Sequence, residues 1–356
     1  MSAAGAAGAA GATSTVDPVD VARAAIEHAY DRDWTDGLPV VPVSAATRDE
    51  FLAATPRDPA EVVAHAGSLG RECTVERVAV NAAMAGCRPE HLPVVLAAWD
   101  ALMAQRVVTG GGWQSTSGPA PLIVVNGDVR ARLGINSAGG SVGPGFRANA
   151  TIARAIGLTV RNVLGIRPHE LDQATQGLPG RFAVCVGENE EESPWEPLSV
   201  ELGAAPGAGS VSAMLIRTCE FVDNRDSTDP ADLLRDIADT VARTGAVVGG
   251  RSSAGLLLGV EHATLLADGG FGKADVAAWI SAHAVRTAAD LRAAGKGRTA
   301  GEAPDDAPFP MVPEPEHLPI VVTGARNAGM SLVVRPFGFG GWSRTTHPVH
   351  APGGAA

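Results

Sequence analysis

The 356-residue sequence predicts an α/β protein built from two related halves that pack around a shared cleft. Three observations lead to this fold class. Helical patterns alternate with short apolar strands along the chain, the length exceeds the ~100 to 200 residues of a usual domain, and a helical hairpin followed by a strand occurs twice. The 43 glycines and 25 prolines, which follow no collagen-like repeat, predict many turns between these elements.

The first half is expected to span residues 16–205, after a disordered tail at residues 1–15. Asp17 and Pro18 are typical of an N-cap and a first helical residue, which predicts a helix to about Tyr30. The further elements expected in this half are a buried strand at 38–43, helices at 74–86 and 90–103, a strand at 121–127, a Gly-rich loop at 134–145, a helix at 147–164 and a strand at 181–187.

The second half is expected to span residues 206–345, before a disordered tail at residues 346–356. Asp-Pro at its start and Gly245 at its end predict a helix over 229–244. The other elements expected are strands at 212–218, 255–260 and 318–324, a helical hairpin at 261–284 and a linker rich in proline and acidic residues at 301–315.

A short internal echo suggests a duplication. The helix carrying Ala97-Ala98-Trp99 precedes the strand PLIVVNG, and the helix carrying Ala277-Ala278-Trp279 precedes LPIVVTG. Chance similarity is the alternative, because repeats this short are common in chains rich in alanine and proline.

The net charge and the hydropathy of the chain limit the kinds of partner that it could bind. A net charge of −11 argues against nucleic-acid binding, which depends on basic groups that neutralise phosphates. The apolar runs are shorter than the ~20 residues of a membrane span, and the N-terminus lacks the basic and apolar regions of a secretory signal. We therefore expect a cytoplasmic protein with a small-molecule substrate and no membrane partner, with homo-oligomerisation left open.

The sequence MAGCRPEH holds the first candidate catalytic group. Cys87 is expected in the turn before a helix, where the helix N-terminus and the adjacent Arg88 would favour the thiolate. His91 follows four residues later and could exchange protons with that thiol. The alternative is that Cys87 is a small buried residue filling a tight helix turn.

The Gly-rich loop is the second candidate site. Its glycines would let backbone amides approach an anion, the helix that follows would supply more, and Arg147 would pair with a carboxylate or phosphate. A structural loop is the alternative, and the spacing does not support a dinucleotide fold. The candidate ligand-binding residues are Asn126, Asn136, Ser141, Gly143, Gly145, Arg147, Asn149 and Trp195.

The third candidate is the acidic loop ENEEESPW, which follows an apolar strand. Crowded carboxylates raise the pKa values of one another, so Glu190 could serve as a general acid or base. We predict no cofactor. A divalent metal bound by Glu188 and Glu190 is one alternative, and a solvated acidic loop anchored by Trp195 is another.

The blocks DGLPVVPV, NAAMAGCRPEH, GPGFRANATIARA and GENEEESPWEP resemble those of a family of uncharacterised bacterial proteins. The resemblance would cover most of the chain and implies a shared architecture. It carries over no reaction, so the residue assignments rest on the chemistry of the side chains.

The leading expectation is a cysteine-dependent enzyme, of lyase or hydrolase type, that acts on a small anionic substrate through Cys87. The alternatives are a thiol redox component in which Cys87 pairs with Cys185, a non-catalytic subunit that binds a small anion, and a metal enzyme with carboxylate ligands.

Overall fold

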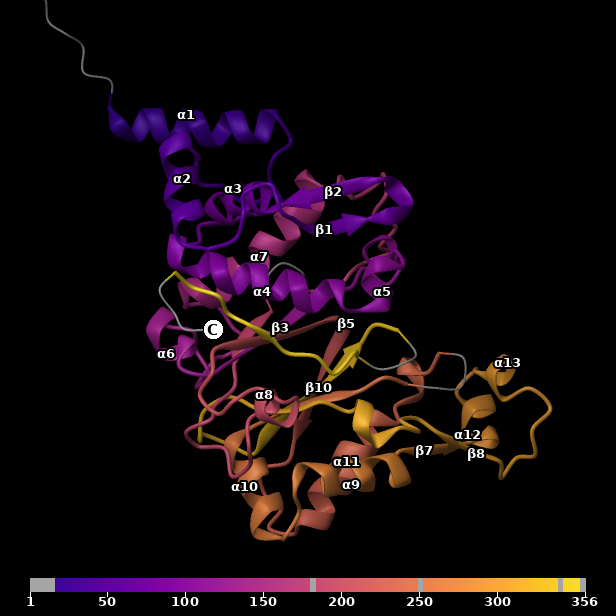
Figure 1. Ribbon diagram of the computed structural model, residues 1–356. Coiled ribbons are helices and arrows are strands. Elements are labelled where there is room, and N and C mark those ends of the chain that lie inside the picture. Colours follow the sequence, from indigo (N-terminus) through magenta and orange to yellow (C-terminus); the bar gives the residue numbers. More distant parts are fainter. Residues whose placement is uncertain (1–16, 180–183, 249–251, 339–341, 353–356) are drawn as a thin grey trace, which may run out of the picture.

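The computed structural model describes residues 17–179, 184–248, 252–338 and 342–352 (Figure 1). The tail expected at residues 1–15 lies outside these ranges, as do residues 181–183 of an expected strand. The helices within the described ranges are α1 (Pro18–Asp31), α2 (Ala45–Ala53), α3 (Val75–Ala85), α4 (Leu92–Met103), α5 (Arg106–Thr109), α6 (Val129–Leu133), α7 (Arg147–Asn162), α8 (Leu198–Glu201), α9 (Pro230–Val241), α10 (Val260–Asp268), α11 (Lys273–His283), α12 (Ala288–Ala293) and α13 (Gly297–Ala300). The strands are β1 (Val62–Ala66), β2 (Arg71–Thr74), β3 (Ala120–Asn126), β4 (Cys185–Gly187), β5 (Ser210–Asp223), β6 (Gly255–Leu258), β7 (Val285–Thr287), β8 (Pro308–Pro310), β9 (Ile320–Val322), β10 (Met330–Pro336) and β11 (His347–Pro348).

A seven-stranded mixed sheet forms the centre of the molecule. Its order is β4-β3-β5-β10-β6-β9, with β11 paired to β5, and the pairs β3–β4 and β6–β9 are parallel while the others are antiparallel. The two ends of this order meet, because the Asn189 amide just after β4 donates to the Val322 carbonyl of β9 at 2.8 Å. The Thr323 hydroxyl also donates to the Gly187 carbonyl at 3.0 Å. The sheet is therefore curled into a half-barrel.

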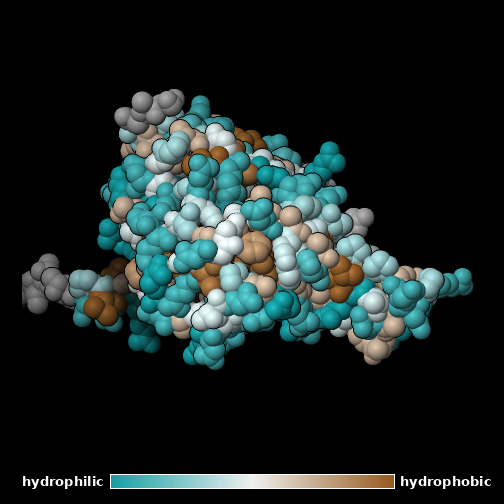
Figure 2. Space-filling view, turned by 90° about the horizontal axis from the view of Figure 1, so that it is seen from below, coloured by the Kyte–Doolittle hydropathy of each residue, from teal (hydrophilic) through white to brown (hydrophobic). Residues whose placement is uncertain are grey.

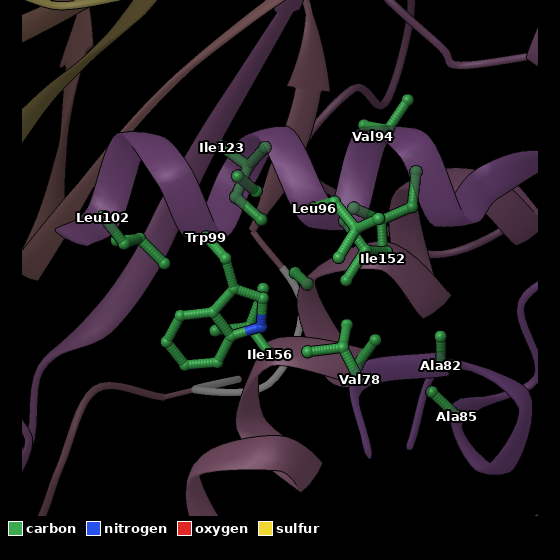
Figure 3. Packing of buried hydrophobic residues seen from close by; sticks show 14 of the residues in the cluster. Val78, Ala82, Ala85, Val94, Leu96, Trp99, Leu102, Ile123, Ile152 and Ile156 are labelled. Atoms are coloured by element: carbon green, nitrogen blue, oxygen red, sulfur yellow. The ribbon is translucent and has the colours of Figure 1, made fainter. Parts of the chain in front are cut away.

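Three apolar clusters hold the layers together. One lies within the curl and includes Leu122, Met214 and Val334. The second packs α3, α4 and α7 against β3 and β5, and the third packs α9, α10 and α11 against β6 and β9. Figure 3 shows Trp99 of α4, a fully buried side chain, among residues of α3 and α7. Such clusters follow from helices with one apolar face and strands buried on both faces.

Local signals in the sequence account for several helix ends. The Asp17 carboxylate accepts a hydrogen bond from the Val19 amide and caps α1. The Thr74 hydroxyl caps α3 in the same way, and Gly86, with φ of +94°, ends it. The helical hairpin expected at 261–284 is formed by α10 and α11.

The segments at 38–43, 308–310 and 347–348 differ from what the sequence predicts, and residues 308–310, within the expected linker, form β8 against β7. Residues 38–43 were expected to form a buried strand, but they form none, and Val41 is exposed. Pro39 and Pro42 lack the amide hydrogens that a strand ladder requires. Residues 347–348, expected within a C-terminal tail, instead form β11 against β5.

The surface is largely hydrophilic in the view from below, and its apolar residues lie in small separate patches (Figure 2). Among the described residues, no helix combines the length and apolarity needed to cross a bilayer.

Candidate functional site

Cys87 lies at the C-terminal end of α3. The amides of Gly86 and Cys87 donate to the carbonyls of Ala83 and Ala82, both at 3.0 Å, which is the pattern of a Schellman motif. A short 3-10 turn at Pro89–His91 follows, and α4 begins only at Leu92. The thiol therefore follows the carbonyl end of a helix, which does not favour a thiolate, rather than opening a new helix as expected.

Burial raises the pKa of the Cys87 thiol to about 12, since the residue is only 4% exposed. A hydrogen bond with Thr151 and the charges of Arg147 and Arg154 act in the opposite direction without offsetting the burial. The thiol is thus protonated at neutral pH. Burial also raises the pKa of Cys185, with a smaller contribution of the same sign from the nearby Cys87.

Arg147, expected to bind an anion, is engaged by the backbone. Its Nε donates to the Gly86 carbonyl at 2.8 Å, and its Nη2 donates to the Cys87 carbonyl at 3.3 Å. The carbonyls at the end of a helix have no hydrogen-bond partner within the helix, and Arg147 supplies donors for those of Gly86 and Cys87. Arg147 therefore fixes the start of α7 against the end of α3.

Asn136 and Asn149 form a second connection, at the start of the Gly-rich loop. The Asn149 carboxamide accepts from the Asn136 amide at 2.9 Å and donates to the carbonyls of Asn136 and Cys185 at 3.0 and 2.9 Å. Because Asn149 is only 3% exposed, these bonds satisfy a buried amide. The pair ties the loop to β4.

The Gly-rich loop itself is a compact turn. The Gly143 amide donates to the Gly140 carbonyl at 2.8 Å, and Ser141 is buried. Gly145 has a φ of +121°, a conformation that L-residues with side chains rarely adopt. In the structure, these glycines allow the backbone to form this turn.

Glu190 and Asn126 meet at the end of β3. The Glu190 carboxylate accepts from the Asn126 Nδ2 at 3.0 Å and from the Gly127 amide at 2.8 Å, and it pairs with Arg130 at 3.1 Å. Asn126 Nδ2 also donates to Glu188 at 2.7 Å. Several donors thus hold the Glu190 carboxylate, which was expected to act as a general acid or base, and tie the acidic loop to the end of β3.

Glu188 forms the innermost part of this network, with no exposed surface. Its carboxylate accepts from the Leu198 amide at 2.8 Å and pairs with Lys273 Nζ at 3.2 Å. Lys273, 8% exposed, also contacts Glu201 and the Glu196 carbonyl, both at 2.7 Å. Sequence reasoning missed Lys273, although it is one of only two lysines in the chain.

Trp195 lies apart from the other expected ligand-binding residues. Its indole Nε1 donates to the Phe271 carbonyl at 3.0 Å, and it borders a cavity of about 750 Å³ together with Lys273 and Glu201. Within the ranges that the structure describes, no group of three or more His, Cys, Asp or Glu side chains is arranged to hold a metal ion.

Arg88 and His91 do lie together, at a cleft of about 680 Å³. Arg132 of α6 and Gly134, which opens the Gly-rich loop, border the same cleft, as does Glu90. Sequence reasoning missed Arg132. Its place in a short polar segment that follows a buried strand is the signal that could have indicated it, because the segments after strands carry functional groups in α/β proteins.

The His91 ring is held in one tautomer. Its Nδ1 accepts from the Arg88 amide at 3.3 Å, so the neutral ring carries its hydrogen on Nε2. Burial lowers the pKa of His91 to about 4, and the Arg147 charge adds to the effect. At neutral pH the ring is therefore an uncharged hydrogen-bond donor.

The expected site residues thus form separate local groups. Arg88 meets His91, Arg147 meets Cys87, Asn149 meets Asn136, and Glu190 meets Asn126, whereas Trp195 borders a different cavity. Comparison of the chain with protein-family models, curated proteins and solved structures finds no match to any of them.

Proposed function

We propose that this protein binds a small anionic molecule, such as a carboxylate or phosphate, in the cleft bordered by Arg88, His91 and Arg132. The observation that carries the proposal is the state of Arg88. Within the part of the chain that the structure describes, its exposed guanidinium has no hydrogen bond or ion pair, and it lies at a concave site. An arginine with five unused donors suits bidentate recognition of an oxyanion.

Two neighbouring groups support anion binding at this cleft. His91 is already neutral at pH 7, so its Nε2–H can donate to an anion without a change in the charge of the ring. Arg132 pairs with Asp128 at 3.2 Å, but both side chains are more than half exposed, so the pair is weak and the guanidinium can turn to a ligand. Glu90 also lines the cleft, and its carboxylate would repel an anion that binds close to it.

A cysteine-dependent lyase or hydrolase reaction is the second proposal, favoured by the position of Cys87 next to Arg88 in the chain. It requires the thiol to lose its proton when substrate binds, because the resting thiol is protonated. The redox alternative, with Cys87 and Cys185, requires oxidation of two buried thiols that are free in the structure.

Calorimetric titration with phosphate and with succinate tests the proposal. We expect Arg88→Gln to weaken binding about tenfold, as for the loss of one charge-assisted contact. Arg23→Gln, on the exposed side of α1, is the matched control and should leave affinity unchanged. No binding by the wild type at millimolar concentration, or equal affinity in the Arg88 variant, would overturn the proposal. Loss of binding in a folded Cys87→Ala variant would favour the cysteine-dependent reaction instead.

We also propose that the two halves share an origin, supported by the strand pairing. β3 pairs with a parallel β4 and an antiparallel β5, and β6 pairs with a parallel β9 and an antiparallel β10. In this arrangement β3 corresponds to β6, whereas the sequence echo aligned β3 with β9. The boundary between the halves would then follow β5 rather than precede it.

A further inference from the structure

A second cavity, of about 820 Å³, shares no lining residue with the Arg88 cleft. α1, the segment at 40–43, α3 and the end of α7 surround it. Cavities of ~300 to 1,000 Å³ with mainly apolar walls are typical of small-molecule sites. Neither the expected site residues nor the proposed anion site uses this cavity.

One face of α3 forms a wall with two chemically different ends. Arg77, Val80, Asn81 and Met84 line the cavity, and their spacing of three, four and seven residues places them on one side of the helix. At 1.5 Å per residue, Arg77 and Met84 are separated by about 10 Å along the axis. The wall therefore runs from a cationic end to an apolar end.

The apolar end is formed around Met84. Its carbonyl accepts from the Val41 amide at 3.0 Å, which brings the segment at 40–43 against the helix. Val40, Val41 and Pro42 contribute apolar surface there, and Val41 is 48% exposed. Methionine adapts its shape to different apolar ligands.

The polar end is formed by α3 and the end of α7. Asn162 Nδ2 donates to Asn81 Oδ1 at 2.9 Å, and Asn81 Nδ2 donates to the Arg77 carbonyl at 2.9 Å. Arg167, which also lines the cavity, follows Asn162 by five residues. These bonds bring the elements that carry Arg77 and Arg167 to the same end.

This end has an excess of positive charge. The Arg77 guanidinium contacts the Glu72 carbonyl at 3.2 Å and has no carboxylate partner among the described residues. Arg167 reaches Asp33 at 3.5 Å, but Asp33 also pairs with Arg161, so two guanidinium groups share one carboxylate. The lining residue Glu76 is already paired with Arg48 at 3.2 Å.

We propose that this cavity binds an amphiphilic anion, of the class of medium-chain carboxylates, with its head at Arg77 and Arg167 and its chain along Val80 toward Met84. The carboxylate would supply the charge that the two arginines lack. Burial of the chain would contribute through removal of apolar surface from water. The length of about 10 Å along α3 favours an extended chain over a compact anion.

Titration with decanoate, monitored by calorimetry and by tryptophan fluorescence, tests this inference, since Trp34 lines the cavity. We expect Arg77→Gln and Arg167→Gln each to weaken decanoate binding about tenfold, and Val80→Trp to abolish it by filling the cavity. The uncharged 1-decanol should bind more weakly than decanoate to the wild type and be insensitive to the arginine variants. Arg23→Gln is again the matched control.

The two sites are distinguishable by their ligands. Arg88→Gln should leave decanoate binding unchanged, and Arg77→Gln should leave succinate binding unchanged. The inference is overturned if decanoate does not bind the wild type, if it binds no better than 1-decanol, or if the folded Arg77 and Arg167 variants retain full affinity. Circular dichroism of each variant establishes that it is folded. If Val80→Trp does not fold, the two arginine variants and 1-decanol decide the outcome.

Discussion

The buried ion pair between Lys273 and Glu188 leads to the sharpest prediction for stability. Replacing Lys273 with Met removes the only cation that pairs with the Glu188 carboxylate among the described residues, while Glu188 stays fully buried. Leaving an uncompensated buried charge costs about 3 to 5 kcal/mol. The Asn126 and Leu198 donors remain at 2.7 and 2.8 Å, so we expect the lower end, about 3 kcal/mol.

Urea unfolding at pH 7, monitored by tryptophan fluorescence, measures this loss. Arg235→Gln is the matched control, because its pair with Asp232 is exposed on both sides and should contribute less than about 1 kcal/mol. The double variant Lys273→Met/Glu188→Gln should recover part of the loss, since the buried charge is removed with its partner. A Lys273→Met variant as stable as Arg235→Gln would refute the reasoning.

Three further predictions concern the segment between α3 and α4. The pKa of His91 is lowered from 6.5 to about 4 in the folded protein. As the pH falls from 6.5 toward 4, the unfolded chain therefore takes up a proton that the folded protein does not, and up to about 3 kcal/mol of stability is lost. Urea unfolding across this range should therefore show a steeper acid loss in the wild type than in His91→Gln, and parallel profiles would contradict it. Cys87 should resist iodoacetamide at pH 8 in the native protein and react after unfolding, because its pKa is raised to about 12; native labelling with an apparent pKa below 8.5 would show the opposite. Gly86→Ala should destabilise the protein by about 1 kcal/mol in thermal unfolding, because φ is +94° there, and an unchanged midpoint would be inconsistent with that strain.

Much of the fold was predictable where local chemistry decides. The N-cap of α1, the Thr74 cap of α3 and the glycine after α3 are signals within a few residues of the features they determine. The strand at 38–43 was predicted wrongly, because hydrophobicity alone does not reveal that two prolines remove ladder donors. The parallel pairing of β6 with β9, across more than fifty residues, has no local signal.

The candidate site was predicted only in part. Sequence reasoning identified Arg88 and His91, which border one cleft, but missed Arg132 and the buried Lys273. It assigned Arg147 to an anion, whereas the structure commits that guanidinium to the end of α3. Whether an arginine is free for a ligand depends on which carbonyls and carboxylates the fold brings to it.

The sequence by itself determined the mixed α/β character, the ends of several helices and the residue types available for chemistry. These depend on short-range propensity, capping and periodicity. Only the tertiary structure decided that the sheet curls until β4 and β9 meet, that Cys87 is buried with a raised pKa, and that α1 and α3 enclose a cavity. The physical reason is that desolvation and charge pairing are set by neighbours distant in sequence, so a residue's chemistry follows from where the fold buries it.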